Sequence, residues 1–360
     1  MAAQRRIVTE ISEHEVLLRA CANIAMDCDA IEFERLSGGA NNQVFMATNG
    51  TDRLVLKKYF RHQGDNRDRR ANEYAFSTYA TEQNVNCIAK PRYSDAETGV
   101  SIFDFIDGRP ILSEDINAHA LDAAIHFISA LNRDRANEHA KAIPSASESY
   151  LSLEGHLKGV ASRIDRLHDL KPNDDIDEDM LSFLEQSVMP TWQRLGNQTR
   201  EFAVNNNIDI QIDLPQSDRC LSPSDFGFHN ALLDQHNKFW FLDFEYAGWD
   251  DPAKMIADFF CQKSVPVPIT FAPKMIKEIS DILLLSLATQ FRMSLLLPIY
   301  QIKWCCILLN EFLPAGRARR TFANGADDAR TMQLTKSREA LLQLDAYTQC
   351  RDQLLKVSNA

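Results

Sequence analysis

The sequence lacks the features of disulfide-stabilised, metal-cysteine and nucleic-acid-binding proteins. Its eight cysteines form no C-x-x-C pair, and no histidine stands at zinc-site spacing from them, which favours buried thiols in a reducing compartment. Acidic residues outnumber basic ones by 50 to 39, giving a net charge of −11. This excess argues against nucleic acid or an acidic membrane surface as the main partner, while it permits a cationic ligand.

Targeting signals, long apolar runs and repeats are also missing. The first residues, MAAQRRIVTEISEHE, contain no apolar signal core. The most apolar region, residues 279–300, is interrupted by Asp281, Gln290 and Arg292, whereas a membrane-spanning helix needs roughly 20 nearly uninterrupted apolar residues. We therefore expect a cytoplasmic protein without membrane contact, in which this region is a core helix. A chain of 360 residues is long enough for two lobes.

The order of predicted elements gives a small, strand-rich front. An Asn49-Gly50 turn joins two of its strands, which predicts an antiparallel meander. The sequence DGRP at residues 107–110 ends this pattern, so we expect an N-terminal lobe over 1–106 and a C-terminal lobe over 107–360. The expected strands are 32–37, 43–48, 53–60, 91–94 and 100–106, and the expected helices are 14–27 and 71–83.

The back of the chain is predicted to be mostly helical, with one short hairpin inside it. Pro190 is expected to kink a helix. The expected helices are 118–132, 150–170, 178–195, 252–262, 273–297, 300–312 and 326–356. The combination predicts an α+β class and a bilobal enzyme with a cleft at the junction.

The chemistry is concentrated in residues 221–252, which read LSPSDFGFHNALLDQHNKFWFLDFEYAGWDDP. Asp225 and Asn230 share a loop, and Asp243 follows an apolar run. A carboxylate that accepts a proton, followed by an amide and a carboxylate that hold Mg²⁺, is the set that phosphoryl transfer needs. If Asp225 only capped a turn, the positions of Asn230 and Asp243 would be coincidental. We interpret the neighbouring His229 as structural or substrate-facing.

The front supplies residues of a type that bind phosphates. Gly38-Gly39 lies between strands, where backbone N–H groups can approach a phosphate, although a plain turn is the commoner explanation. No G-x-x-x-x-G-K-[ST] is present, so the chain has no P-loop. Lys57, on a strand, and Glu73, on the next helix, have the arrangement that positions nucleotide phosphates in protein kinases. An exposed edge lysine is the alternative for Lys57, and Lys58 replaces it if the strand is rotated.

Together these motifs resemble those of the aminoglycoside phosphotransferase and choline kinase superfamily of kinase-like small-molecule phosphotransferases. Its catalytic H-G-D-x-x-x-x-N corresponds to PSDFGFHN at 223–230, and its metal motif I-D-[FW]-E to LDFE at 242–245. Its glycine loop corresponds to LSGGANNQVF, with Asn42 at the family's Asn position. Its hinge resembles SIFDFIDGRP, where the backbone of Asp104, Phe105 and Ile106 would meet adenine.

The resemblance implies a bilobal, protein-kinase-like α+β fold with a small antiparallel-sheet N-lobe and a large, mainly helical C-lobe. It implies ATP, or GTP, as donor and Mg²⁺ held by Asn230 and Asp243. Asp225 would be the base, and the γ-phosphate would pass to a hydroxyl of an amino alcohol, a sugar or an aminoglycoside. The oligomeric state is not specified.

The chain departs from the family pattern at two places. Pro223-Ser224 replaces the His-Gly before the catalytic Asp. Met255 stands where many relatives have a structural Asp, and Asp258 is expected to take that role. The competing interpretation is a kinase-like nucleotide-binding module without transfer; a protein kinase is disfavoured because no A-P-E follows D-F-E. Four aromatic residues are candidates to line an acceptor pocket, with core packing as the favoured alternative for the last two: Tyr246, Trp249, Tyr300 and Trp304.

Overall fold

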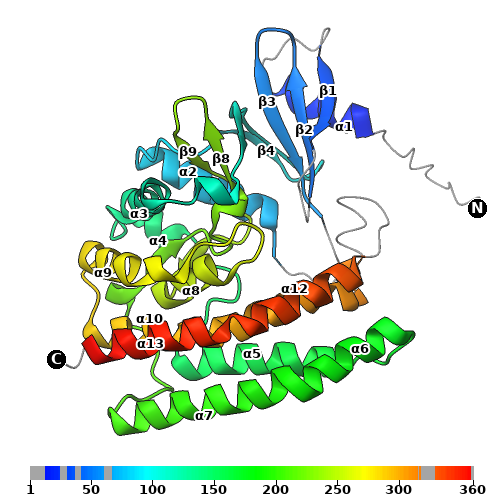
Figure 1. The fold of residues 1–360 in the computed structure, drawn as a ribbon. Helices are drawn as coiled ribbons and strands as arrows, with labels where there is room; N and C mark the ends of the chain where they lie inside the picture. Colours follow the sequence, from blue (N-terminus) through cyan, green and yellow to red (C-terminus); the bar gives the residue numbers. More distant parts are fainter. Residues whose placement is uncertain are drawn as a thin grey trace, which may run out of the picture.

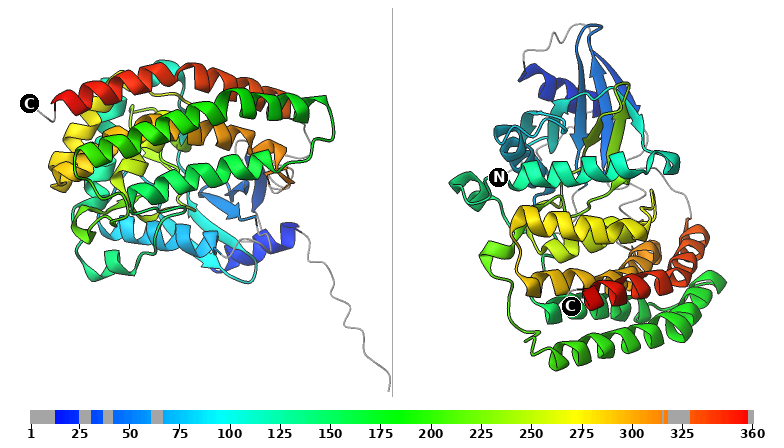
Figure 2. Two further views of the ribbon diagram at one scale, coloured as in Figure 1. Left: turned by 90° about the horizontal axis from the view of Figure 1, so that it is seen from below. Right: turned by 60° about the vertical axis from the view of Figure 1, so that its left-hand side comes forward.

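The computed structural model describes residues 13–24, 31–36, 42–60, 67–314, 316–317 and 329–357. Gly38 and Gly39 lie outside these residues, so their predicted role remains a prediction. A five-stranded sheet occupies one end of the molecule, and long helices lie side by side at the other end (Figures 1 and 2). The predicted bilobal α+β architecture is therefore confirmed.

The five strands of the first sheet have the order β1-β2-β3-β5-β4, and every neighbouring pair is antiparallel. In the Asn49-Gly50 turn, the Asn49 side chain accepts hydrogen bonds from the backbone of Thr51 and Asp52, and Gly50 has a φ of 87°. That left-handed backbone is readily adopted by glycine, so the predicted turn is confirmed. The strands are β1 (Glu32–Leu36), β2 (Gln43–Thr48), β3 (Arg53–Lys58), β4 (Pro91–Asp95) and β5 (Val100–Asp104).

Two helices belong to the first third of the chain but pack differently. Helix α1 (Glu13–Ala22) covers the sheet, and its Leu17 packs in a small core with Leu56 and Ile102. Helix α2 (Arg69–Glu82) begins where the Asp68 side chain caps the Ala71 N–H. It buries Phe76 and Tyr79 in the large core of the helical part instead. Helix α2 is thus fixed against the part of the chain that carries Asp225 and Asp243.

The remainder is mainly helical and contains two small sheets, of order β10-β7 and β6-β8-β9. Its strands are β6 (Gly108–Pro110), β7 (Cys220–Ser222), β8 (Ala231–Asp234), β9 (Phe239–Phe241) and β10 (Gly248–Asp250). Its main helices are α3 (Ala118–Asn132), α4 (Glu138–Ala142), α5 (Leu153–His168), α6 (Asp175–Phe183), α7 (Met189–Asn205), α8 (Pro252–Cys261), α9 (Ala272–Leu283), α10 (Leu287–Leu308), α12 (Arg330–Leu342) and α13 (Leu344–Val357).

The large core sits directly behind the residues expected to carry the chemistry. Phe127 of α3 stacks on Phe241 of β9 with ring centroids 4.6 Å apart. Phe226 and Phe228, from the segment between β7 and β8, pack on Phe259 of α8 at 4.8 and 5.5 Å. Alternate residues of that segment therefore anchor it in the core, which leaves Asp225 and His229 in reach of the surface.

Helix α10 runs without interruption through Pro298, so the predicted break between residues 297 and 300 was wrong. Proline removes one backbone hydrogen bond, and dense burial of the surrounding turns outweighs that loss. The predicted single helix 273–297 is instead divided at Leu284, whose φ of 54° ends α9, and at Ser286, which caps α10. In the window that makes Leu287–Phe312 resemble a membrane span, 78% of the residues are buried inside the protein, as in a core helix.

Helices α6 and α7 replace the predicted helix 178–195. The Asp174 side chain caps α6 and starts it three residues earlier than expected. A π-helical segment, Leu184–Val188, then connects α6 to α7, and Pro190 lies in the first turn of α7. Proline is tolerated there because first-turn N–H groups have no intrahelical partner. Regular α-helix is therefore interrupted by the π segment before Pro190, not by Pro190 itself.

Candidate active site

Lys57 reaches the junction between the sheet and the helical part. Its side chain is 9% exposed, so it is not an edge lysine, and its Nζ lies 2.7 Å from Glu73 Oε2 on α2. It also forms an ion pair with Asp243. Burial alone would lower the pKa of Lys57, but Asp243 and Glu73 raise it well above its usual value. The structure therefore brings together the predicted pair and the predicted acid.

Glu73 is held by donors from both parts of the molecule. Besides Lys57, its carboxylate accepts hydrogen bonds from the Tyr59 hydroxyl at 2.8 Å and from the Phe244 backbone N–H at 3.3 Å. Burial raises the pKa of Glu73, while Lys57 opposes that effect. Glu73 therefore fixes the position of the lysine and of the segment that follows Asp243.

The Asp243-Phe244-Glu245 segment is fixed by two asparagines. Asn72 donates to the backbone oxygens of Ala247 and Glu245 at 2.9 and 3.1 Å. Asn42 donates to Glu245 Oε2 at 2.7 Å. Asn42 is thus in contact with the predicted metal motif, and its role toward nucleotide stays a prediction. The sequence reasoning missed Asn72, because nothing marks an asparagine inside a helix as the partner of a distant loop.

Three carboxylates, from Glu73, Asp243 and Glu245, offer oxygens within 4.8 Å of one another. All three are paired with cations: Glu73 and Asp243 with Lys57, and Glu245 with Arg69 at 3.5 Å. Glu73 and Glu245 are buried, whereas the Asp243 side chain is 32% exposed. Asp243 is therefore the member of this cluster that is best placed to bind a metal ion.

Asn230 lies beside Asp243, as the sequence predicted. Its backbone oxygen accepts a hydrogen bond from the Leu242 N–H at 2.9 Å, which joins the two loops. Its side-chain nitrogen donates to the Asp225 backbone oxygen at 3.0 Å. That contact orients the amide and leaves its oxygen for a cation. The residues present thus fit Mg²⁺, which favours carboxylate and amide oxygens.

Asp225 is ionised, oriented and partly accessible. His229 Nε2 lies 3.2 Å from its Oδ1, Asn230 Nδ2 lies 3.3 Å from its Oδ2, and its side chain is 34% exposed. Burial would raise the pKa of Asp225, but His229 and Asn230 lower it below its usual value. The same pairing raises the pKa of His229 against the effect of burial. Asp225 is thus a charged, partly accessible carboxylate that can accept a hydrogen bond from an incoming hydroxyl.

The unusual Pro223-Ser224 sequence is supported from behind by a buried lysine. Ser224 has a φ of 67°, in the left-handed region that favours glycine. Lys254 of α8 is 1% exposed and donates to Ser224 Oγ at 2.9 Å and to Asp250 Oδ2 at 2.6 Å. Ser224 therefore replaces the family's glycine and adds a hydrogen bond that a glycine could not accept.

Asp258 occupies the position expected for a structural acid. Met255 is fully buried in the core, and Asp258, one turn later on α8, accepts hydrogen bonds from Lys303 at 3.0 Å and from the Trp304 indole at 2.8 Å. Tyr300 is buried and hydrogen-bonded to His156 at 2.7 Å. Tyr300 therefore packs in the core, whereas Trp304 remains partly accessible.

The predicted hinge lies at the end of β5. The Asp104 side chain binds Arg92 at 2.5 Å, and the Phe105 ring lies 4.5 Å from the Arg53 guanidinium. The Ile106 backbone oxygen accepts a hydrogen bond from Gly108. All three hinge residues are partly exposed. Their contact with adenine stays a prediction.

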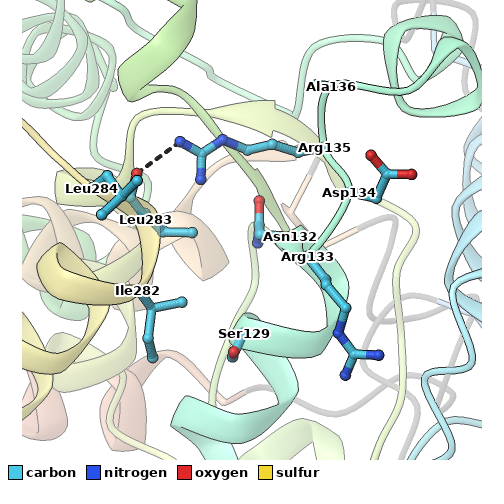
Figure 3. A pocket seen from close by; sticks show the side chains of 9 residues that line it. All are labelled: Ser129, Asn132, Arg133, Asp134, Arg135, Ala136, Ile282, Leu283 and Leu284. Carbon is cyan, nitrogen blue, oxygen red and sulfur yellow. Dashed lines mark hydrogen bonds between the residues drawn. The ribbon is translucent and has the colours of Figure 1, made fainter.

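A pocket of about 360 Å³ lies elsewhere, between the end of α3 and the α9–α10 turn (Figure 3). Arg135 crosses it and donates to the Leu283 backbone oxygen at 2.8 Å. The residues that line it are Ser129, Asn132, Arg133, Asp134, Arg135, Ala136, Ile282, Leu283 and Leu284. None of them is a predicted site residue, so this pocket is separate from the candidate active site.

Comparison with known proteins identifies the family. The model of the phosphotransferase enzyme family, abbreviated APH, matches residues 32–269, about two thirds of the chain. No curated protein sequence matches. Among solved structures, ethanolamine kinase from Plasmodium vivax is 15% identical, with a TM-score of 0.60 over 92% of this chain and 86% of that one.

Two further structures have the same fold. Choline kinase from Cryptosporidium parvum Iowa II is 14% identical, with a TM-score of 0.55 over 96% of this chain and 97% of that one. A spectinomycin phosphotransferase in complex with ADP and spectinomycin is 11% identical, with a TM-score of 0.59 over 89% and 93%. The protein therefore belongs to the phosphotransferase enzyme family and is a small-molecule phosphotransferase with a kinase-like bilobal fold.

Proposed function

We propose that the protein transfers the γ-phosphate of ATP to a hydroxyl of a small molecule, with Asp225 as the base. The observation that carries this proposal is the convergence at one junction of Lys57, Glu73 and Asp243 with the Asp225–Asn230 loop. Phosphoryl transfer is catalysed mostly by positioning and by charge neutralisation. GTP is the alternative donor, and residues 106 and 107 remain our proposed boundary between the lobes.

Each residue has one role in the proposed step. Lys57, held by Glu73, binds the donor's phosphates. The acceptor oxygen attacks the γ-phosphorus, the bond from that phosphorus to the β–γ bridging oxygen breaks, and the hydroxyl proton passes to Asp225. The products are ADP and a phosphomonoester. Because the pKa of Asp225 is lowered, it is ionised and ready to accept this proton at neutral pH.

Asn230 and Asp243 would hold Mg²⁺ in this proposal, which would neutralise charge on the phosphates. The partly exposed Asp243 carboxylate and the backbone link from Leu242 to Asn230 support this pair. The spectinomycin phosphotransferase structure contains ADP, and the structure of a second similar protein, LicA, contains AMP. Both support an adenine nucleotide as donor. The hinge at Asp104–Ile106 and Asn42 lie on the N-terminal side of the junction, where the nucleotide would bind.

The base assignment is tested by Asp225→Asn, which keeps the shape of the side chain and removes the charge. We expect turnover to fall about 10²- to 10⁴-fold, the usual contribution of a general base. Mg-ATP binding, measured by thermal shift, should persist. Asp95→Asn is a matched control, since Asp95 only caps a turn through the Glu97 and Thr98 N–H groups. Near-normal turnover by Asp225→Asn would exclude this base.

The binding-module alternative is tested with an acceptor panel of amino alcohols, sugars and aminoglycosides. ATP consumption that depends on one acceptor supports phosphotransfer. Mg-ATP binding without turnover on any member of the panel would favour a nucleotide-binding module. A Lys57→Met variant that loses Mg-ATP binding would locate the nucleotide at this junction in either case.

A further inference from the structure

Glu148 stands beside the catalytic loop, in the connection between α4 and α5. The preceding residue, Ser147, accepts a hydrogen bond from Ser224 Oγ at 3.4 Å and donates its N–H to the Tyr246 backbone oxygen at 2.9 Å. Ser224 is the residue before Asp225. The side chains of Glu148 and Asp225 are each 34% exposed. The connection that carries Glu148 is therefore hydrogen-bonded to the residue next to Asp225, and both acids are partly exposed.

The Glu148 backbone and side chain are both held in place. Its φ of 51° lies in the left-handed region that residues other than glycine rarely adopt. Arg163 of α5 donates to both carboxylate oxygens at 2.5 Å. Such strained residues persist where the surrounding structure determines them, and they cluster at ligand sites. The proposed phosphotransfer step does not use this ion pair between Glu148 and Arg163.

Lys303 is linked to the catalytic loop through Asp258 and Lys254. It is buried on α10 and binds both carboxylate oxygens of Asp258, at 3.0 and 3.1 Å. Lys254 lies 3.7 Å from the same carboxylate and donates to Ser224 Oγ at 2.9 Å. Burial would raise the pKa of Glu148, but Arg163 and Lys303 lower its pKa to about 2. Glu148 is therefore charged throughout the neutral range.

Charges of opposite sign are balanced around Glu148 and behind the catalytic loop. Glu148 is paired with Arg163, and Asp258 with Lys303. Lys254, behind them, is paired with Asp250. A cationic ligand would therefore meet carboxylates that are already neutralised.

An aromatic cage for a quaternary ammonium is not supported by the nearby rings. Tyr300 and Trp249 are buried and hydrogen-bonded in the core, with His156 and with the Ala140 backbone oxygen. The partly exposed rings have other partners: the Arg69 guanidinium lies 4.9 Å from the Tyr246 ring, Tyr150 packs on His156 at 5.7 Å, and Trp304 donates to Asp258 at 2.8 Å. A neutral polyol suits these surroundings better, because each hydroxyl both donates and accepts a hydrogen bond.

We propose that Glu148, held by Arg163, forms one wall of the acceptor site and that the acceptor is an uncharged polyhydroxylated molecule. This inference rests on the proposed function. Glu148 accepts hydrogen bonds from the acceptor's hydroxyls, and Arg163 orients the carboxylate. A different hydroxyl of the same molecule reaches Asp225. Glu148 thus selects and positions the acceptor without taking part in proton transfer.

The test compares turnover of neutral monosaccharides, choline, ethanolamine and kanamycin at saturating Mg-ATP. We expect a monosaccharide to be the best acceptor, with a KM that changes less than about twofold between low and high salt, since screening weakens only interactions between charges. Glu148→Gln should raise KM about tenfold with kcat changed by less than about threefold, the signature of lost ground-state and transition-state binding alike. Arg163→Lys should have the same effect.

The matched control is Glu154→Gln. Glu154 also pairs with an arginine, Arg200, at 3.2 Å, but it lies at the start of α5. The nine residues from Glu154 to Arg163 span roughly 13 Å of helix. The KM of the Glu154→Gln variant should equal that of the unchanged protein. Thermal unfolding of all variants separates a binding effect from loss of the fold.

The two proposals fail in different ways. If choline, ethanolamine or kanamycin is the best acceptor, with a salt-sensitive KM, the inference about the wall is overturned and the phosphotransferase proposal stands. If no acceptor is phosphorylated, the phosphotransferase proposal fails. Calorimetry with the same sugars, Mg²⁺ and a non-hydrolysable ATP analogue then decides the inference. Glu148-dependent sugar binding supports it, and the absence of binding by every sugar overturns it.

Discussion

Replacing the buried Lys254 by Met tests how the catalytic loop is supported. Methionine keeps the length and apolar volume of the lysine stem and removes the ammonium group, with its charge and its hydrogen-bond donors. In the unchanged protein, Lys254 binds Asp250 at 2.6 Å and Ser224 at 2.9 Å, and Asp250 is fully buried. The variant therefore leaves a buried carboxylate without its cation and a buried hydroxyl without its donor.

The magnitude follows from the protonation of Asp250. Burial raises its pKa to about 6, even with Lys254 beside it. Without the lysine, the cheapest response is to protonate the carboxylate. At pH 7.5 this costs about 2 kcal/mol, since each unit between pKa and pH corresponds to 1.36 kcal/mol. Loss of the Ser224 hydrogen bond adds about 1 kcal/mol, so the free energy of unfolding should fall by about 3 kcal/mol.

The loss should depend on pH, and the sign can be worked out. The folded-state pKa of Asp250 is above its unfolded value, so the folded state gains protons, and stability, as pH falls through about 6. At pH 5 Asp250 is protonated in the unchanged protein too. The Asp250 contribution to the difference then vanishes, and we expect a loss of about 1 kcal/mol from the remaining hydrogen bond.

Urea denaturation of both proteins at pH 7.5 and pH 5 measures these differences. Lys277→Met is the matched control, because Lys277 also forms an i,i+4 pair, with Asp281 at 2.6 Å, but is 76% exposed. That variant should lose less than about 0.5 kcal/mol at either pH. Equal losses by Lys254→Met at the two pH values, or a loss within that of the control at pH 7.5, would refute the reasoning.

Three further predictions concern the candidate site. Lys57→Met should lower kcat/KM at least about 100-fold, because a phosphate-binding charge acting in the transition state is lost, while Lys58→Met should stay near normal; the reverse order in steady-state assays would move the role to Lys58. His229→Gln removes the cation that lowers the pKa of Asp225, so the acidic limb of the kcat/KM profile should shift to higher pH; an unshifted limb would contradict the pairing. Asn72→Ala removes two hydrogen bonds to the backbone after Asp243 and should lower the free energy of unfolding, measured by urea denaturation, by about 2 kcal/mol. A decrease below about 0.5 kcal/mol would show that these hydrogen bonds are not needed to hold the segment.

Local patterns in the sequence predicted the polar residues that face the junction. Asp225, Asn230 and Asp243 lie in one short segment, and Lys57 and Glu73 lie on consecutive elements. Their spacing, together with the resemblance to kinase motifs, predicted that they belong to one site. Helix 118–132 was predicted to the residue, because its apolar spacing and its Asn117 cap agree. These features depend on neighbours along the chain.

The supporting residues could not be predicted in the same way. Asn72 and the Ala247 backbone it binds are 175 positions apart, and Ser147, next to Glu148, meets Ser224 only through the fold. A lysine such as Lys254 normally indicates a solvent-exposed helix face. The prediction of a helix break near Pro298 was wrong for a related reason, since the burial that keeps α10 continuous comes from helices distant in sequence.

The ion pair between Lys57 and Asp243 has a consequence for the order of ligand binding. In this conformation the lysine ammonium occupies the place beside Asp243 where a divalent cation would sit. Phosphates that draw Lys57 away would uncover the carboxylate, and a cation on Asp243 would free the lysine for phosphates. Whichever ligand binds first breaks the Lys57–Asp243 ion pair, so the second ligand binds without having to break it. We expect nucleotide and Mg²⁺ to increase each other's affinity by the same factor, as thermodynamic linkage requires.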